Sequence, residues 1–428
     1  MSTLLLTRAA SLYAMRELLR RAGCSSEFIE RCRVSFDDGG ADLMPDGERD
    51  VRIRFPIAAV PAALEELFRP KTAEILECTA DLLRTTLHTL SRAEEMEATT
   101  RDAHGRFPGS ASLAHRNGSL QRPVIDEYGL ELQGALARLL PQWKPAPRRL
   151  RAKISHDIDL VGVPFRWKEA AGHLLRRGHP GAAIRDVASA VTDANPAYLQ
   201  AVPEIVKRSA ARGLDSAIYW KASGGTAWDT GYDLREGKVR RMLEWADRKG
   251  IETGLHPGYY TFGEPAALQE EVRKIRSVVG DRPMGGRQHF LRWTPETWLH
   301  WEQAGLSYDS TVGYADQAGF RAGTCIPYHP WLLSQDRESR LLEIPLIVME
   351  CTLLEYMKLS GVAAIELVRV LIERCAAVGG VFTLLWHNSS LLERRYEAIY
   401  DRILDMLAGS EHYDWQAEIK PFPLPRVV

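Results

Sequence analysis

The sequence predicts an α/β protein in which a parallel sheet or barrel follows a smaller, mostly helical α+β region. From about residue 151, helices that end at glycines alternate with short apolar strands, which is typical of the β/α class. Residues 1–140 show helical periodicity without this alternation. Residues 141–150 are rich in proline and basic side chains, as linkers often are. We therefore expect an N-terminal accessory domain over 1–140, a linker over 141–150 and a β/α domain over 151–428.

Composition limits the classes of partner. With 428 residues, 45% of them hydrophobic and 26% charged, the chain can bury a large core. The net charge is −1, so nothing favours nucleic acid or an anionic membrane as a partner. No apolar run reaches transmembrane length, and the N-terminus lacks a signal-like apolar segment. The six cysteines form no C-x-x-C pair and are expected to be free thiols. We expect a cytoplasmic protein without membrane insertion; the sequence does not indicate its oligomeric state.

Two helices and one strand are expected before residue 99. The apolar residues of 12–24 and 71–90 recur every three or four positions, which predicts amphipathic helices. Residues 51–60 alternate apolar and charged side chains and predict a strand with one exposed face. Residues 99–122 are polar and without period, which predicts a long loop.

The β/α region predicts a longer series of elements. Helices are expected over 202–213, 237–250, 265–280, 294–306, 361–380 and 393–407. Strands are expected within KISHDIDL (153–160), DSAIYW (215–220), IETGLHPGYY (251–260), GGRQHFLRW (285–293), SYDST (307–311) and VFTLLWHN (381–388). Thr294 is the expected N-cap of its helix, because Pro295 suits the first helical position.

Polar side chains recur where these strands end. In KISHDIDL, Asp157 and Asp159 lie where the strand ends, and strand alternation places both side chains on the same side of the sheet. Two carboxylates at such a short distance repel each other unless a cation lies between them or they share a proton. An Asx turn would also explain the two aspartates. Parallel strands end at one edge of a sheet, so these side chains are expected to gather there. The further residues of this kind are His256, Arg287, His289, Arg292, Asp309, Arg321, Trp386, His387 and Asn388.

This set of side chains favours metal-assisted hydrolysis. One carboxylate and two imidazoles suit a divalent ion such as zinc, with a position left open for water. The ion would activate that water, a second carboxylate would take its proton, and a histidine would protonate the leaving amine. A serine nucleophile is disfavoured because no G-x-S-x-G occurs, and no Walker motif or G-x-G-x-x-G opens a helix.

The motifs SHDID, GLHPGYY, GGRQHFLR, YDSTVGY and LLWHN, in this order, resemble those of the NodB-homology polysaccharide deacetylases of carbohydrate esterase family 4. The closer resemblance is to a divergent bacterial branch with an extra N-terminal domain. The likeness covers residues 151 to about 410. It implies a distorted (β/α) barrel and a metal-dependent N-deacetylase that acts on an N-acetylated sugar in glycan or glycoconjugate biosynthesis.

The resemblance also implies roles for the catalytic and metal-binding residues. Asp157 would be the base and Asp159 a metal ligand, together with His256. The second histidine of the family's His-x-x-x-His is Tyr260 here, so His289 is the candidate replacement ligand, with Tyr260 itself as the alternative. The divalent metal is expected to be zinc. The remaining catalytic residues are expected to be Arg287, which braces the base, Asp309, which supports Arg287 or the acid, and His387, the general acid.

Residues outside the metal centre have less specific interpretations. The expected substrate contacts are Tyr260, Arg292, Arg321 and Trp386. His156 points away from Asp157 and is expected in the core or behind the site. Aromatic residues around Trp220, Trp228 and Tyr232 could stack on a sugar or simply cover the barrel. Two alternatives to the deacetylase stay open: hydrolysis of another C–N bond, such as a small amide, and a non-catalytic glycan-binding or scaffold protein without metal.

Overall fold

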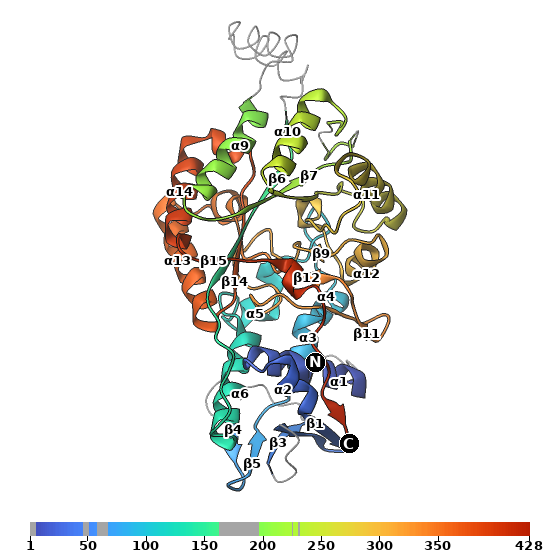
Figure 1. Cartoon of the computed structure of the whole chain (residues 1–428), viewed down its shortest axis with the longest axis vertical. Coiled ribbons are helices and arrows are strands. Elements are labelled where there is room, and N and C mark those ends of the chain that lie inside the picture. Colours follow the sequence, from blue (N-terminus) through green and yellow to red (C-terminus); the bar gives the residue numbers. More distant parts are fainter. Residues whose placement is uncertain (1–5, 46–50, 58–66, 162–196, 225, 230–231) are drawn as a thin grey trace, which may run out of the picture. The chain divides into compact units, whose positions relative to one another are not determined.

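The computed structural model describes residues 6–45, 51–57, 67–161, 197–224, 226–229 and 232–428. The chain divides into two compact units, each built from separate segments (Figure 1). The first unit comprises Met1–Lys153, Phe290–Leu384 and Ser410–Val428, and the second comprises Ile154–His289 and Leu385–Gly409. The expected mixed α/β architecture with parallel strands is confirmed. Closure into a barrel, and the division of the chain at residues 141–150, stay predictions.

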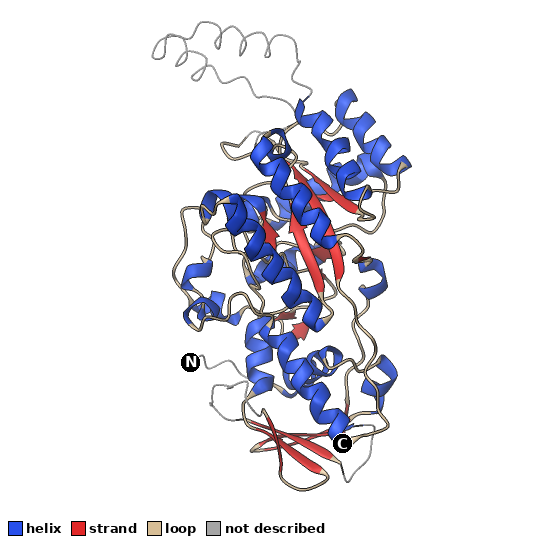
Figure 2. Cartoon of the chain, turned by 90° about the vertical axis from the view of Figure 1, so that its left-hand side faces the viewer, coloured by secondary structure: helices blue, strands red, loops and turns tan. Residues whose placement is uncertain are grey.

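A six-stranded sheet forms one layer of the first unit (Figure 2). Its strands lie in the order β16-β1-β2-β3-β5-β4, with parallel pairs at β16-β1 and β3-β5. The strands are β1 (Arg33–Asp37), β2 (Gly40–Met44), β3 (Arg52–Pro56), β4 (Phe68–Pro70), β5 (Ile75–Cys78) and β16 (Arg426–Val427). The strand expected over 51–60 is confirmed as β3, and its last three residues lie outside the described part of the chain.

Helices of the first unit pack on one another beside this sheet (Figure 2). They are α1 (Arg8–Arg21), α2 (Ser26–Arg31), α3 (Leu82–Leu90), α4 (Ala93–Glu97), α5 (Leu113–Arg116) and α6 (Val124–Leu139). The expected helix over 12–24 is confirmed as α1. The single helix expected over 71–90 is wrong, because β5 forms the first part of this segment and pairs with β3 and β4. Backbone pairing in the sheet overrides the helical periodicity there, and Asp81 then caps α3 through the amide of Arg84 at 3.0 Å.

The remaining elements of the first unit are mostly two-residue strands, together with the helices α12 and α13 and the longer strand β14. They are α12 (Pro295–Gln303), β9 (Tyr308–Asp309), β10 (Trp331–Leu332), β11 (Arg337–Glu338), β12 (Leu342–Glu343), β13 (Val348–Met349), α13 (Gly361–Val378), β14 (Val381–Leu385, whose last residue belongs to the second unit) and β15 (Glu411–His412). The start of α12 is confirmed: Pro295 occupies the first turn and the Thr294 amide donates to the Thr297 hydroxyl at 3.0 Å.

Three parallel strands form the centre of the second unit. β6 (Arg151–Ile158, beginning three residues before the unit), β7 (Ser216–Trp220) and β8 (Glu252–Leu255) lie side by side in that order. The α-helices in the described part of this unit are α9 (Ala197–Ala210), α10 (Gly237–Arg248), α11 (Pro265–Val279) and α14 (Arg394–Leu407). Because the strands are parallel, their carboxyl ends meet at one edge, where Asp159, Lys221 and His256 follow β6, β7 and β8.

The segment after α11 departs from the strand expected over 285–293. Gly285 and Arg287 exchange backbone hydrogen bonds with Leu255 of β8, at 2.9 and 3.1 Å. The backbone then turns: Phe290 and Leu291 have φ of 61° and 52°, which a strand does not allow. The expected strand is therefore wrong beyond Arg287, although its first residues do lie against β8.

Two expectations from composition concern the whole chain. All six cysteines are free thiols, as expected. Among the residues that the structure describes, none of the helices combines the length and apolar character that crossing a bilayer requires.

Glu271 of α11 makes stability depend on pH. Its buried carboxylate accepts a hydrogen bond from the Gly258 amide at 2.9 Å, and burial raises its pKa to about 7. The folded state then holds a proton that the unfolded state releases near pH 4.3. We expect the free energy of unfolding to fall by up to about 3 kcal/mol between pH 4.5 and 7, relative to Glu271→Gln, which has no proton to lose. Urea denaturation of both proteins across this range measures it; parallel pH profiles would contradict the prediction.

Candidate metal centre

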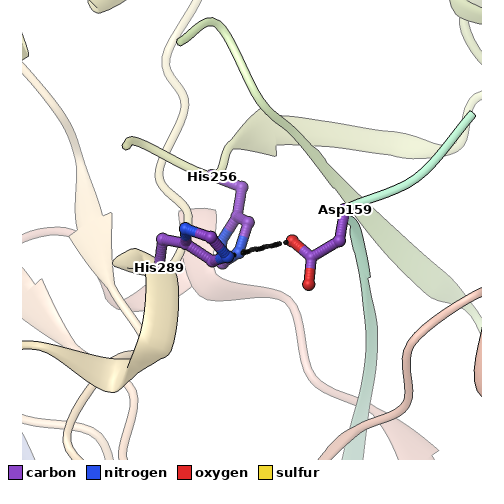
Figure 3. Close-up of side chains that lie close together, drawn as sticks. All are labelled: Asp159, His256 and His289. Atoms are coloured by element: carbon purple, nitrogen blue, oxygen red, sulfur yellow. Dashed lines mark ion pairs between the residues drawn. The ribbon is translucent and has the colours of Figure 1, made fainter. Parts of the chain in front are cut away.

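Asp159, His256 and His289 converge at the carboxyl edge of β6 and β8 (Figure 3). Nε2 of His256 lies 3.2 Å from Oδ1 of Asp159, and Nε2 of His289 lies 3.5 Å from the same oxygen. The two imidazole rings lie edge to face, with centroids 5.0 Å apart. One potential ligand atom from each residue falls within 4.8 Å of the others. The structure thus brings together the three residues that the sequence analysis assigned to the metal.

The opposite nitrogen of each ring is held by a hydrogen bond. Nδ1 of His256 lies 2.6 Å from the carbonyl oxygen of Arg287, and Nδ1 of His289 lies 2.8 Å from Oδ1 of Asp229. Both partners accept hydrogen bonds, so each Nδ1 carries the proton and each Nε2 presents a lone pair toward Asp159. Metal-ligating histidines are usually oriented in this way. The donor set of two such imidazoles and one carboxylate therefore fits a divalent ion such as zinc.

Electrostatics favour the ligating form of these groups. Burial alone would raise the pKa of Asp159, but the imidazoles of His289, His256 and His387, when they carry a proton, hold it well below its usual range. Burial lowers the pKa of His289, although the two carboxylates beside it act in the other direction. At neutral pH, His289 is therefore neutral, as ligation requires.

Asp157 lies beside the candidate metal ligands and pairs with a positively charged side chain. It is buried, and its Oδ1 accepts a hydrogen bond from Nη1 of Arg287 at 2.9 Å. Arg287 is itself fully buried and donates from Nη2 to the Ser155 hydroxyl, also at 2.9 Å. Oδ2 of Asp157 is 3.6 Å from Nδ1 of His256. As strand alternation predicts, Asp157 and Asp159 thus face the same histidine.

His387 approaches the centre from the end of β14. Its Nε2 lies 3.6 Å from Oδ2 of Asp159, and its side chain is partly exposed. The amide of the preceding Trp386 donates to the Ser155 carbonyl at 3.0 Å, which holds this segment beside β6. Asn388 holds the segment after His387 in place, because its Nδ2 donates to the carbonyls of Leu160 and Tyr198, each at 2.8 Å.

Two glycines bring His289 to His256. A Cβ added at Gly286 would lie 1.8 Å from the Leu255 carbonyl oxygen, and one added at Gly254 would lie 2.4 Å from the Gly285 carbonyl oxygen. A side chain at either position would therefore hold the segment away from β8. Gly254 in β8 and Gly286 directly before Arg287 are the local features of the sequence that permit this contact.

Sequence reasoning missed Lys221 and Asp229. The buried ammonium of Lys221 forms an ion pair with Asp229 at 3.0 Å and lies 3.4 Å from Nδ1 of His289. Lys221 directly follows β7, so the rule that located the other strand-end residues could have found it. Asp229 lies in the loop beyond, and no sequence signal distinguishes it there.

The aromatic residues of the second unit differ in exposure. Tyr260 is 50% exposed and lies edge to face with Tyr259, while Trp228 is 44% exposed and stacks on Tyr259. Trp386, an expected substrate contact, is buried against the rings of Tyr396 and Tyr400 and contributes to packing. The substrate-binding roles of Tyr260 and Trp386 stay predictions.

Three further residues that the sequence analysis considered are buried in the core of the second unit. His156 lies in the core, with its ring nitrogens 3.0 Å from the Trp386 carbonyl and 3.2 Å from the Ser216 hydroxyl. Trp220 and Tyr232 are also buried. The Tyr232 hydroxyl donates to the Ile158 carbonyl at 2.8 Å and accepts from the Lys221 amide at 2.9 Å. This hydroxyl links the ends of β6 and β7.

Three predicted site residues lie in the first unit and have partners there. Asp309 is buried opposite Glu343 on the parallel strand β12 and accepts from the Thr311 amide at 2.9 Å. Arg321 is buried with Glu95, and its Nη1 donates to the Gly313 carbonyl at 2.9 Å. Nε of Arg292 donates to the His104 carbonyl at 2.8 Å. Their roles toward catalysis or substrate stay predictions.

Comparisons with known proteins cover the chain unevenly. Residues 39–141 match the model of a family of unknown function, DUF7033. No curated protein matches the chain. Two solved structures named polysaccharide deacetylase are similar to it. One, from Mycobacterium smegmatis, has 14% identity and a TM-score of 0.44 over 66% of this chain and 96% of its own. The other, from Pseudomonas aeruginosa PAO1, has 16% identity and a TM-score of 0.41, and the match covers 64% of this chain and 90% of that structure's chain. At such low similarity, what this chain does has to be inferred from its own residues.

Gly286→Ala tests whether the contact with β8 forms the centre. The added methyl group meets the Leu255 carbonyl, so the segment that carries Arg287 and His289 must shift. We expect a loss of stability of about 1–3 kcal/mol and a large loss of zinc affinity. Denaturation and zinc titration against a competing chelator measure the two effects. Gly263→Ala is the matched control, since its Cβ meets no atom within 4 Å. Unchanged zinc affinity in Gly286→Ala would contradict the assignment.

Proposed function

We propose that this chain is a metal-dependent hydrolase that removes the acetyl group of an N-acetylated sugar. The observation that carries the proposal is the convergence of Nε2 of His256, Nε2 of His289 and Oδ1 of Asp159, beside a buried Asp157 that is paired with Arg287. A carboxylate and two oriented imidazoles next to a second, unligated carboxylate form the arrangement that metal-assisted hydrolysis needs.

Asp159, His256 and His289 would hold the ion. When bound, a divalent metal lowers the pKa of water and polarises the carbonyl oxygen of the substrate. The protein supplies the orientation, because hydrogen bonds to Arg287 and Asp229 fix both rings.

Asp157 would act as the general base and His387 as the general acid. Asp157 takes the proton of the attacking water, while Arg287 and the strand hold its carboxylate in place. His387 reaches the same region from β14 and donates a proton to the sugar nitrogen as the C–N bond breaks. The products are acetic acid and the free amine, and the proton that His387 gives to the nitrogen balances the one that Asp157 takes from the water.

The choice of an N-acetylated sugar rests on the order of the motifs SHDID, GLHPGYY, GGRQHFLR, YDSTVGY and LLWHN. Exposed aromatic rings at Trp228 and Tyr260 support it, since such rings can stack on a sugar. The free cysteines support a location in a reducing cytosol.

Zinc-loaded protein should release acetate from members of a panel of N-acetyl sugars and nucleotide sugars. Asp157→Asn, loaded in the same way, is the control for contaminating activity. Turnover of small linear or cyclic amides alone would favour hydrolysis of another C–N bond. Less than about a tenth of an equivalent of zinc after reloading and dialysis would favour a non-catalytic glycan-binding protein instead.

Substitution of the two aspartates should separate their roles. Asp157→Asn keeps the three ligands, so we expect it to bind zinc and to lose about 10²–10⁴-fold in turnover, as for a removed general base. Asp159→Ala removes a ligand, so zinc affinity and turnover should fall together. Zinc titration and acetate release measure the two quantities. Equal zinc loss in both variants would show that the roles are assigned wrongly.

A further inference from the structure

The carboxylate of Asp229 is the centre of a buried network beside the metal ligands. Its Oδ1 lies 2.8 Å from Nδ1 of His289 and 3.0 Å from the Lys221 ammonium. Its Oδ2 accepts from the Thr226 hydroxyl at 2.7 Å and from the Tyr259 amide at 3.1 Å. The loop after β7 and the loop after β8 thus hold one carboxylate against one imidazole.

Nδ1 of His289 faces two groups with opposite demands. The carboxylate of Asp229 can only accept, so it requires a proton on Nδ1 and leaves the lone pair on Nε2. The ammonium of Lys221, 3.4 Å away, can only donate, so it would require the lone pair on Nδ1 and place the proton on Nε2. A protonated Nε2 cannot ligate a metal. The choice between these two partners therefore decides whether His289 can be a ligand.

From this geometry we propose that Asp229 is a positioning residue that sets His289 in its metal-ligating tautomer against the competing donor Lys221. The shorter distance to Asp229 favours this tautomer. Lys221 in turn balances the buried charge of Asp229. The inference rests on the proposed metal centre and deepens it.

The two histidines of the centre differ in this respect. His256 is oriented by the backbone carbonyl of Arg287, which no substitution of a side chain removes. His289 depends on a side chain from another loop. Because position 260 is a tyrosine, the third metal ligand in this proposal is His289. Asp229 is then needed to orient that ligand.

Zinc affinity of the full chain tests the proposal by competition with a chelator. Asp229→Ala should lower affinity about 10–100-fold, as loss of an orienting partner typically does. In His289→Ala, the further change Asp229→Ala should cost nothing more, because Asp229 acts through His289. Lys221→Met introduced into Asp229→Ala should restore part of the affinity, since it removes the donor that stabilises the wrong tautomer. A purely structural role for Asp229 would leave the cost of Asp229→Ala in place in the His289→Ala background.

Glu271→Gln is the matched control. Glu271 is a buried carboxylate that holds the loop after β8 through Gly258 but does not contact His289. Its substitution should leave zinc affinity within twofold of the wild type. An equal loss in Glu271→Gln and Asp229→Ala would show that loop attachment, not the tautomer, matters.

Nitrogen NMR of the histidine rings gives a readout that needs no metal. In the metal-free wild type, His289 should carry its proton on Nδ1, and in Asp229→Ala the proton should move to Nε2. A wild-type His289 protonated on Nε2, or Asp229→Ala with unchanged zinc affinity, would overturn the proposal. Wild-type protein with the expected tautomer but no zinc binding would instead overturn the proposed function while leaving the orienting role of Asp229 in place.

Discussion

The backbone contact between β8 and the segment that begins at Gly285 is the interaction on which the candidate metal centre depends. Two hydrogen bonds with Leu255 align this segment, and the glycine at 286 allows the chains to approach. The carbonyl of Arg287 then orients His256, while the side chain of Arg287 reaches Asp157. Two residues later, His289 reaches Asp159. One short backbone pairing thus places the partner of Asp157, one candidate metal ligand and the hydrogen-bond acceptor of another.

Two buried carboxylates of the second unit are each paired with a buried cation. Asp157 lies against Arg287, and Asp229 lies against Lys221. Removing one member of such a pair leaves an uncompensated charge in a medium of low dielectric constant, which costs several kcal/mol. Asp159 differs, because its neighbours are imidazoles that can be neutral. A carboxylate that faces neutral imidazoles attracts a cation, and this contrast distinguishes the candidate metal centre from the two ion pairs around it.

Much of the centre could be predicted because it follows from strand ends. Alternation placed Asp157 and Asp159 on one side, and the glycine-terminated helices indicated parallel strands whose ends coincide. The resemblance also assigned Arg287 to the base and His289 to the metal. The segment around them was nevertheless expected to be a strand throughout, whereas it turns at Phe290. Similarly, the helical periodicity over 71–90 concealed β5, because partners far along the chain decide whether an apolar segment joins a sheet.

The sequence by itself determined the mixed α/β class, many helices and strands of the β/α region and most of the residues at the strand ends, since these depend on local periodicity and on turn residues. Only the tertiary structure decided the partners of those residues. It buried Trp386 in the core, gave Asp309 a partner on β12 and joined Asp229 to His289 across 60 residues. Such contacts connect loops whose separation in the chain says nothing about their separation in space, and no local pattern encodes them.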